Sequence, residues 1–110
     1  MEISTTTNYT HILTTEGSYS NFHQAFISQE LDKVTNHKII QLSENLNTTV
    51  KDLSLLLDIA INHKANGISF VVICNRIDID EIPEEINVVP TLTEAEDLLE
   101  MEAIERDLGF

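Results

Sequence analysis

The segment 68–74, Ile-Ser-Phe-Val-Val-Ile-Cys, constrains the fold most strongly, because every residue in it except Ser69 is apolar. A half-exposed strand alternates apolar and polar residues, whereas a short, nearly continuous apolar run is typical of a strand covered on both faces. Such strands belong to parallel sheets with helices packed against them. The segment therefore predicts the central strand of an α/β domain.

The flanking sequence predicts further strands at residues 8–15, 38–42 and 86–89, and helices at residues 20–35, 50–65 and 93–108. The order β-α-β-α-β-β-α favours right-handed crossovers and a mostly parallel or mixed sheet of four to five strands with about three helices. Residues 1–7 are polar and expected to fray, so that residues 8–110 form a single domain. The predicted core comprises Ile40, Leu42, Leu53, Leu56, Leu57, Ala60, Phe70, Val72, Val88, Leu98 and Leu99.

Several residues predict where the helices begin and end. Thr49 is a plausible N-cap for the helix 50–65, and Thr91 with Glu94 forms a capping-box pattern before the last helix. Gly109 stands where a left-handed residue ends a helix, and Phe110 is expected to fold back on Ile104.

The net charge of −13 is large for 110 residues. It argues against direct binding to nucleic acid or to an anionic membrane, since both need Lys and Arg, and it favours a basic protein partner. There is no apolar run of about 18 residues and no secretory signal pattern at the N-terminus. The single cysteine, Cys74, excludes an internal disulfide. These features predict a cytoplasmic protein.

No residue cluster predicts a reaction. The four histidines, His11, His23, His37 and His63, are not spaced like zinc ligands, and Cys74 has no cysteine partner. No pairing of a nucleophile with a base is visible. The sequence therefore predicts a protein without catalysis, without a cofactor and without a metal.

Three stretches resemble the STAS domain, the fold of anti-sigma factor antagonists. Residues 39–43, Ile-Ile-Gln-Leu-Ser, are similar to its central strand, which usually ends Asp-Leu-Ser. Residues 50–67 are similar to the following helix and its glycine stop. Residues 88–95, Val-Val-Pro-Thr-Leu-Thr-Glu-Ala, are similar to the closing strand, proline turn and last helix. The resemblance covers roughly residues 38–110 and implies a regulatory module of bacterial type that binds other proteins.

The usual phosphorylation motif of this family is absent. Its Asp-Ser-Ser-Gly-Leu segment falls on residues 49–53, Thr-Val-Lys-Asp-Leu, so neither serine is present. Thr48 and Thr49 are the nearest hydroxyls, and a phosphate there would sit at a helix N-terminus. The alternative is that Thr49 is simply a helix cap.

We expect partner contacts at the N-terminal end of helix 50–65 and in the adjacent loop, through Leu46, Thr48, Thr49 and Lys51. The last helix holds acids that its own dipole does not favour, namely Glu105 and Asp107 in the final turn. Together with Glu96 and Glu100 they predict an acidic docking face for a basic partner, the alternative being a face that serves solubility alone.

The C-terminal Glu-Arg-Asp-Leu-Gly-Phe is similar to a group of small acidic bacterial proteins sometimes labelled ribonuclease Z. That enzyme needs a longer chain and a His-x-His-x-Asp-His zinc cluster, so its activity is not expected here. A second functional hypothesis is a structural or accessory subunit, which either forms a homodimer or serves a neighbouring enzyme such as a ribonuclease Z.

Overall fold

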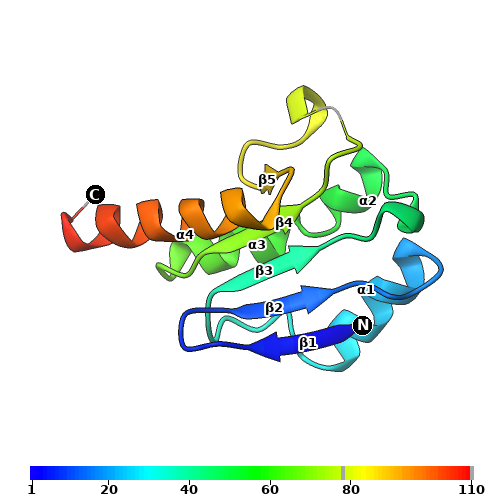
Figure 1. Cartoon of the computed structure of the whole chain (residues 1–110), viewed down its shortest axis with the longest axis horizontal. Helices are drawn as coiled ribbons and strands as arrows, with labels where there is room; N and C mark the ends of the chain where they lie inside the picture. The colour runs from blue at the N-terminus through cyan, green and yellow to red at the C-terminus, as the bar shows by residue number, and fades with distance from the viewer. Residues whose placement is uncertain (78, 110) are drawn as a thin grey trace.

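The chain folds into a five-stranded sheet with helices on both faces (Figure 1). The computed structural model describes residues 1–77 and 79–109. The strands lie side by side in chain order: β1 (Glu2–Thr5), β2 (Thr10–Leu13), β3 (Lys38–Gln41), β4 (Phe70–Ile73) and β5 (Asn87–Val89). Strand β1 is antiparallel to β2, and the other pairings are parallel. The α/β class and the mixed sheet are therefore confirmed.

The helices divide between the two faces of the sheet. Helices α1 (Tyr19–Ser28), α2 (Val50–Ser54) and α3 (Leu57–Ala65) pack on one face, as right-handed crossovers between parallel strands require. Helix α4 (Leu92–Asp107) follows the last strand and packs on the other face. Short 3₁₀ turns lie at Glu44–Leu46 and Ile79–Glu81.

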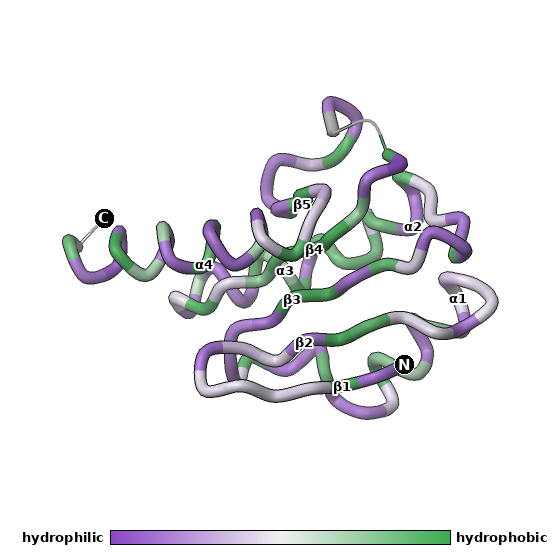
Figure 2. Tube along the Cα trace, in the orientation of Figure 1, coloured by the Kyte–Doolittle hydropathy of each residue, from purple (hydrophilic) through white to green (hydrophobic). Residues whose placement is uncertain are grey.

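Strand β4 is buried on both faces, as its sequence predicts. Val72 lies in register between Ile40 and Val88 and faces α1 to α3. Val71 and Ile73 point to the opposite face, where they pack with α4. This hydrophobic strand is thus an interior strand of the sheet, beside the edge strand β5 and one position from the centre (Figure 2).

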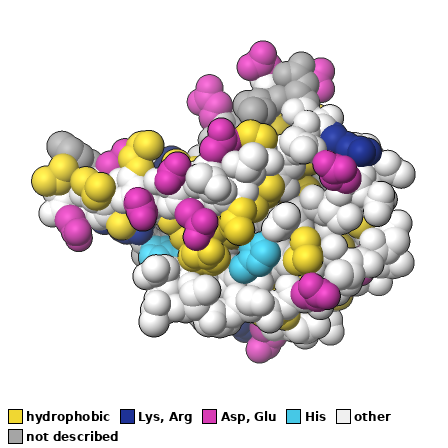
Figure 3. Space-filling model, viewed as in Figure 1, with side chains coloured by type: hydrophobic (Ala, Val, Ile, Leu, Met, Phe, Trp, Pro, Cys, Tyr) yellow, Lys and Arg dark blue, Asp and Glu magenta, His cyan; other side chains and the backbone are white. Residues whose placement is uncertain are grey.

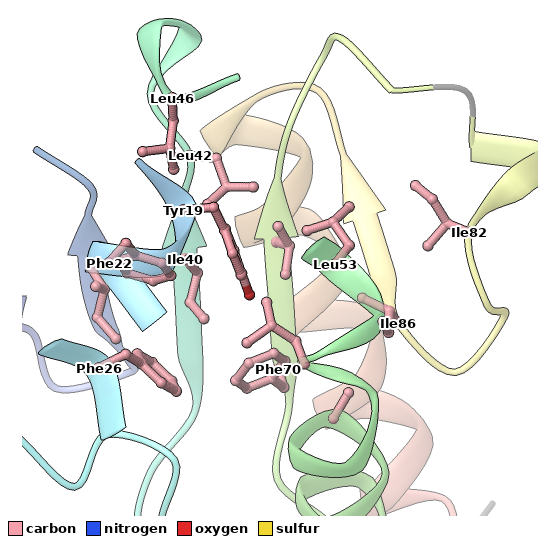
Figure 4. Packing of buried hydrophobic residues seen from close by; sticks show 14 residues of the cluster. Tyr19, Phe22, Phe26, Ile40, Leu42, Leu46, Leu53, Phe70, Ile82 and Ile86 are labelled. Carbon is pink, nitrogen blue, oxygen red and sulfur yellow. The ribbon is translucent and has the colours of Figure 1, made fainter. Parts of the chain in front are cut away.

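The main core lies between the sheet and helices α1 to α3 (Figure 4). Phe22 and Phe26 of α1 and Leu53 of α2 meet Ile40 and Phe70 of the sheet. The predicted core residues are buried, except that Leu57, Val88 and Leu98 are only partly buried. Burial of these apolar groups is the main force that holds the helices on the sheet.

The expected fraying of residues 1–7 is wrong, because Glu2–Thr5 form the edge strand β1. A tight turn joins it to β2: the Thr6 amide donates to the Tyr9 carbonyl at 2.8 Å, and Thr6 Oγ1 accepts from the amides of Asn8 and Tyr9. All four β1 side chains are exposed, so the strand depends on backbone pairing rather than on an apolar pattern.

Two helices are shorter than predicted. The helix 50–65 is divided into α2 and α3, because the amides of Leu55 and Leu56 bond to carbonyls three residues back and tighten the chain there. The helix 20–35 ends at Ser28, two residues before Glu30, whose φ is +59°. A glutamate is an unusual residue for this left-handed conformation, which explains why the sequence gives no stop signal.

Helix α4 ends as predicted near Gly109, which has φ +82°. The expected contact of Phe110 with Ile104 lies outside the described residues. Within the described part of the chain, no helix combines the length and apolar character needed to cross a membrane.

Candidate functional site

The loop predicted to bind a partner borders a cleft of about 260 Å³ at the carboxyl ends of β3 and β4. Ser43, Asn47 and Thr48 line one side, and Cys74 and Arg76 line the other. The Ser43 amide donates to Thr14 Oγ1 at 2.7 Å, which fixes the start of the loop against β2. The carboxyl edge of a parallel sheet is a common position for a binding site.

Leu46 is buried, contrary to the accessible position that the predicted partner contact requires. It is only 2% exposed and packs in the main core under the 3₁₀ turn. The turn begins at Ser43, whose hydroxyl accepts from the Asn45 amide, and Asn47 ends it with φ +51°. This geometry turns Leu46 inward, so the side chain anchors the loop.

Thr49 is the N-cap of α2, as predicted. Its hydroxyl accepts from the Asp52 amide, and the Asp52 carboxylate accepts from the Thr49 amide, both at 3.1 Å. A phosphate on Thr49 would break this capping box and stand beside a carboxylate of like charge. The geometry therefore favours the role of a simple helix cap.

Thr48 is part-buried, and its Oγ1 has no hydrogen-bond partner among the described residues. A buried hydroxyl is a poor acceptor for a phosphoryl group unless the loop opens. Lys51 is exposed on α2 and can reach a partner. Of the four predicted contacts, Thr49 and Lys51 are exposed, and Lys51 is the one that carries a charge.

The charges at the cleft are balanced. Arg76 Nη2 lies 3.8 Å from Glu44 Oε2, and Asn75 Nδ2 donates to Glu44 Oε1 at 3.5 Å. Arg76 and Glu44 are both well exposed, so this pair contributes little to stability. Because the carboxylate offsets the arginine, the cleft has no strong preference for an anion.

The apolar contacts of helix α4 with the sheet lie in its first half, while Glu102 and Arg106 form hydrogen bonds to Asn87 and Ser69 farther along the helix. Thr91 caps it by accepting from the Glu94 amide at 3.2 Å. Ala95 and Leu99, one turn apart, are buried against Val71 and Ile73 of the sheet. None of its described residues after Leu99 is buried, and the helix continues beyond the edge of the sheet (Figure 1).

The projecting half of α4 exposes a second apolar face. Met101, Ile104 and Leu108 are 54%, 59% and 65% exposed. Residues three and four apart share one side of a helix, so these three form a single row. Leu108 follows Leu99 by nine residues, which is about 180° around the helix axis, so the row points away from the sheet. We call these three residues the outer row.

Carboxylates flank the outer row. Glu100, Glu105 and Asp107 are exposed, and apolar and acidic groups are interleaved along this helix (Figure 3). Glu96 is different, because its Oε2 accepts a hydrogen bond from the hydroxyl of Tyr9 at 3.0 Å, which ties α4 to the turn between β1 and β2. Arg106, the only base of α4, donates to Ser69 Oγ at 3.3 Å on the side facing the sheet.

The structure does not bring the two predicted contact regions together. The loop 43–49 and α2 lie at the carboxyl end of the parallel strands, whereas the last turns of α4 project beyond the opposite end (Figure 1). A single small partner cannot use both. The outer row was not predicted, because α4 has apolar residues on two faces and its sequence does not show which face the sheet covers.

A buried basic pair is the chemical feature that sequence reasoning did not find. Lys38 Nζ donates to His63 Nε2 at 3.0 Å, and His63 Nδ1 donates to the Ile59 carbonyl at 2.8 Å. Lys38 Nζ also donates to the carbonyls of Lys33 and Asn36. Both side chains are almost completely buried, and desolvation lowers the pKa of each.

The contacts of Lys38 and His63 indicate a structural role. The ring of His63 packs on Phe70 with centroids 4.9 Å apart, and its two nitrogens are both engaged. His37 has a similar role, since its Nδ1 accepts from the Ser69 amide at 2.9 Å. Desolvation, aided by Arg106, lowers the pKa of His37. Each ring joins two segments of the fold.

The described residues contain no group of three or more His, Cys, Asp or Glu side chains that could hold a metal ion. Cys74 is a free, part-buried thiol at the end of β4. No protein-family model matches the chain, and no curated protein matches it significantly. The resemblance to the STAS domain therefore stays a prediction.

Proposed function

We propose that the protein is a non-catalytic, STAS-like regulatory module that acts in the cytoplasm by binding another protein. One observation carries this proposal: the outer row of α4 exposes three large apolar side chains on a helix that projects from the body of the fold. Scattered exposed apolar residues are ordinary, but a row in one helical register with a charged rim is a feature of interaction surfaces.

The arrangement of α4 supports an interaction rather than a role in stability. The buried face, with Ala95 and Leu99, already holds the helix on the sheet. Met101, Ile104 and Leu108 are not part of that packing, and a bound partner would remove their apolar surface from water. The surrounding acids keep the free protein soluble.

The proposal is tested by crosslinking in the native cell. A photoreactive amino acid at position 104 is compared with the same residue at position 55, because Leu55 is equally exposed at 56% but lies at α2. We expect one defined covalent adduct from position 104 and none from position 55. Identical diffuse adducts from both positions would contradict an interaction site on α4.

The second candidate function is a structural or accessory subunit that associates with its own copy through the same row. The exposed apolar side chains are the observation that favours it. Sedimentation velocity over a range of protein concentrations distinguishes the two functions, since self-association alone raises the sedimentation coefficient without another protein.

A further inference from the structure

The charges around the outer row indicate what kind of partner covers it. We infer that the projecting half of α4 is a docking site for a cationic amphipathic helix of another protein. This inference rests on the proposed interaction function and adds the chemical class of the partner. It is argued from three observations: the spacing of the row, the position of the acids, and the position of the only base on this helix.

The spacing of the row suits a helix. Met101, Ile104 and Leu108 are separated by three and four residues and extend over about 10 Å, or two turns. This is the spacing with which side chains of one helix pack into the grooves of another. A partner helix would present apolar residues at i, i+3 or i+4, and i+7 along one face.

Acidic residues lie on both sides of the outer row. At about 100° per residue, Glu105 follows one side of the outer row, and Glu100 and Asp107 follow the other. All three are exposed. A partner helix whose apolar face is bordered by Lys or Arg on both sides would pair with them, as charged positions beside an apolar seam do in coiled coils.

No base on α4 competes for these acids. Between Leu92 and Asp107 the helix has seven carboxylates and one arginine. That arginine, Arg106, is turned inward and donates to Ser69 Oγ. The flanks of the row are therefore left with negative charge that a cationic partner can neutralise.

The same charges argue against a second copy as the occupant. Two copies of α4 packed through their outer rows would bring Glu100, Glu105 and Asp107 of each chain into contact with like charges. Each chain also has a net charge of −13, which opposes association over a longer range. An anionic membrane surface is repelled for the same reason.

The test uses the isotope-labelled full chain and a synthetic peptide of about 18 residues, long enough to form a helix on binding. The peptide has leucines at i, i+3, i+4 and i+7 and lysines on both flanks of that face. A second peptide with glutamate in place of each lysine is the matched control. Backbone amide chemical shifts report where each peptide binds.

A cationic peptide is attracted to any acidic protein, so the location of binding decides the outcome. We expect shifts concentrated on residues of α4 after Leu99, and none with the glutamate peptide. Ile104→Ser should weaken binding about tenfold or more, whereas Leu55→Ser, an equally exposed control, should change it less than about twofold. Raising the salt to about 0.3 M should weaken the complex by screening.

Two results would overturn the inference. Shifts spread over the whole acidic surface, unchanged by Ile104→Ser, would mean general charge attraction without a docking site. Self-association of the free chain that is lost in Ile104→Ser, with no localised peptide binding, would make a second copy the occupant. In that second case the interaction function of α4 would stand and only the class of partner would be wrong.

Discussion

Acidification should destabilise the fold through His63. The ring is fully buried, its Nδ1–H donates to the Ile59 carbonyl, and its Nε2 accepts from Lys38. Protonation would place a proton on Nε2 beside the lysine ammonium, with 3.0 Å between the nitrogens. Burial is the largest cause that lowers the pKa of His63 below its ordinary value of 6.5, and Lys38 acts in the same direction against the opposing hydrogen bond to Ile59.

The size of the effect follows from proton linkage. Between the lowered folded pKa and 6.5, the unfolded chain binds a proton at this site and the folded chain does not. The contribution of neutral His63 to the free energy of unfolding is complete above pH 6.5. It is lost as the pH falls toward the pKa that His63 has in the folded state. The slope for one group approaches about 1.4 kcal/mol per pH unit. His37 adds to it, because its pKa is lowered as well.

The assay is chemical denaturation of the wild type and of His63→Gln at a series of pH values from about 7.5 to about 5, a range that brackets the histidine titration. The variant will be less stable at every pH, so the readout is the difference in slope. Protonation of the many carboxylates relieves repulsion and acts equally on both proteins. We expect the free energy of unfolding to change less steeply with pH in the variant than in the wild type, by up to about 1.4 kcal/mol per pH unit. Parallel pH profiles would refute the reasoning.

Three further predictions concern stability. Phe26→Ala removes a fully buried ring and should lower the free energy of unfolding by about 3–5 kcal/mol in urea, and a loss below about 1 would contradict the packing described. Thr91→Ala removes the cap of α4 and should cost about 1 kcal/mol, accompanied by faster amide exchange in its first turn; unchanged exchange there would argue against the cap. Gly67→Ala should cost about 1 kcal/mol or more in thermal melts, because Gly67 has φ +72°, while its new Cβ would meet Arg106 only at an ordinary 3.7 Å; a melt equal to wild type would show that the backbone relaxes.

The middle of the fold could be predicted because its residues carry local signals. The continuous apolar run of β4 identifies a strand with helices on both sides, and Thr49 and Thr91 cap the helices that follow them. These signals reflect side chains whose burial or hydrogen bonding is decided within a few residues. The mixed sheet then follows from the order of strands and helices.

Other features depend on distant parts of the chain. Strand β1 exposes every side chain and is held by backbone pairing with β2, so no apolar pattern predicts it. Glu30 ends α1 in a left-handed conformation that a glutamate rarely adopts. Leu46 resembles an exposed loop residue until the 3₁₀ turn folds it into the core.

The outer row of the candidate site is another feature that the sequence alone does not predict. Helix α4 has apolar residues on two opposite faces, so its sequence has no single apolar stripe. Only the packing of Ala95 and Leu99 on the sheet decides which face is covered. The acids of this helix are evident in the sequence, but the exposure of the outer row beside them is not.

The most direct test of the interaction function compares two variants against the partner captured by crosslinking. The dissociation constants of the partner from Ile104→Ser and from Leu55→Ser are measured under identical salt. If the outer row is the docking surface, Ile104→Ser should bind about tenfold more weakly or worse, and Leu55→Ser should match the wild type. Equal affinities for the two variants would contradict it.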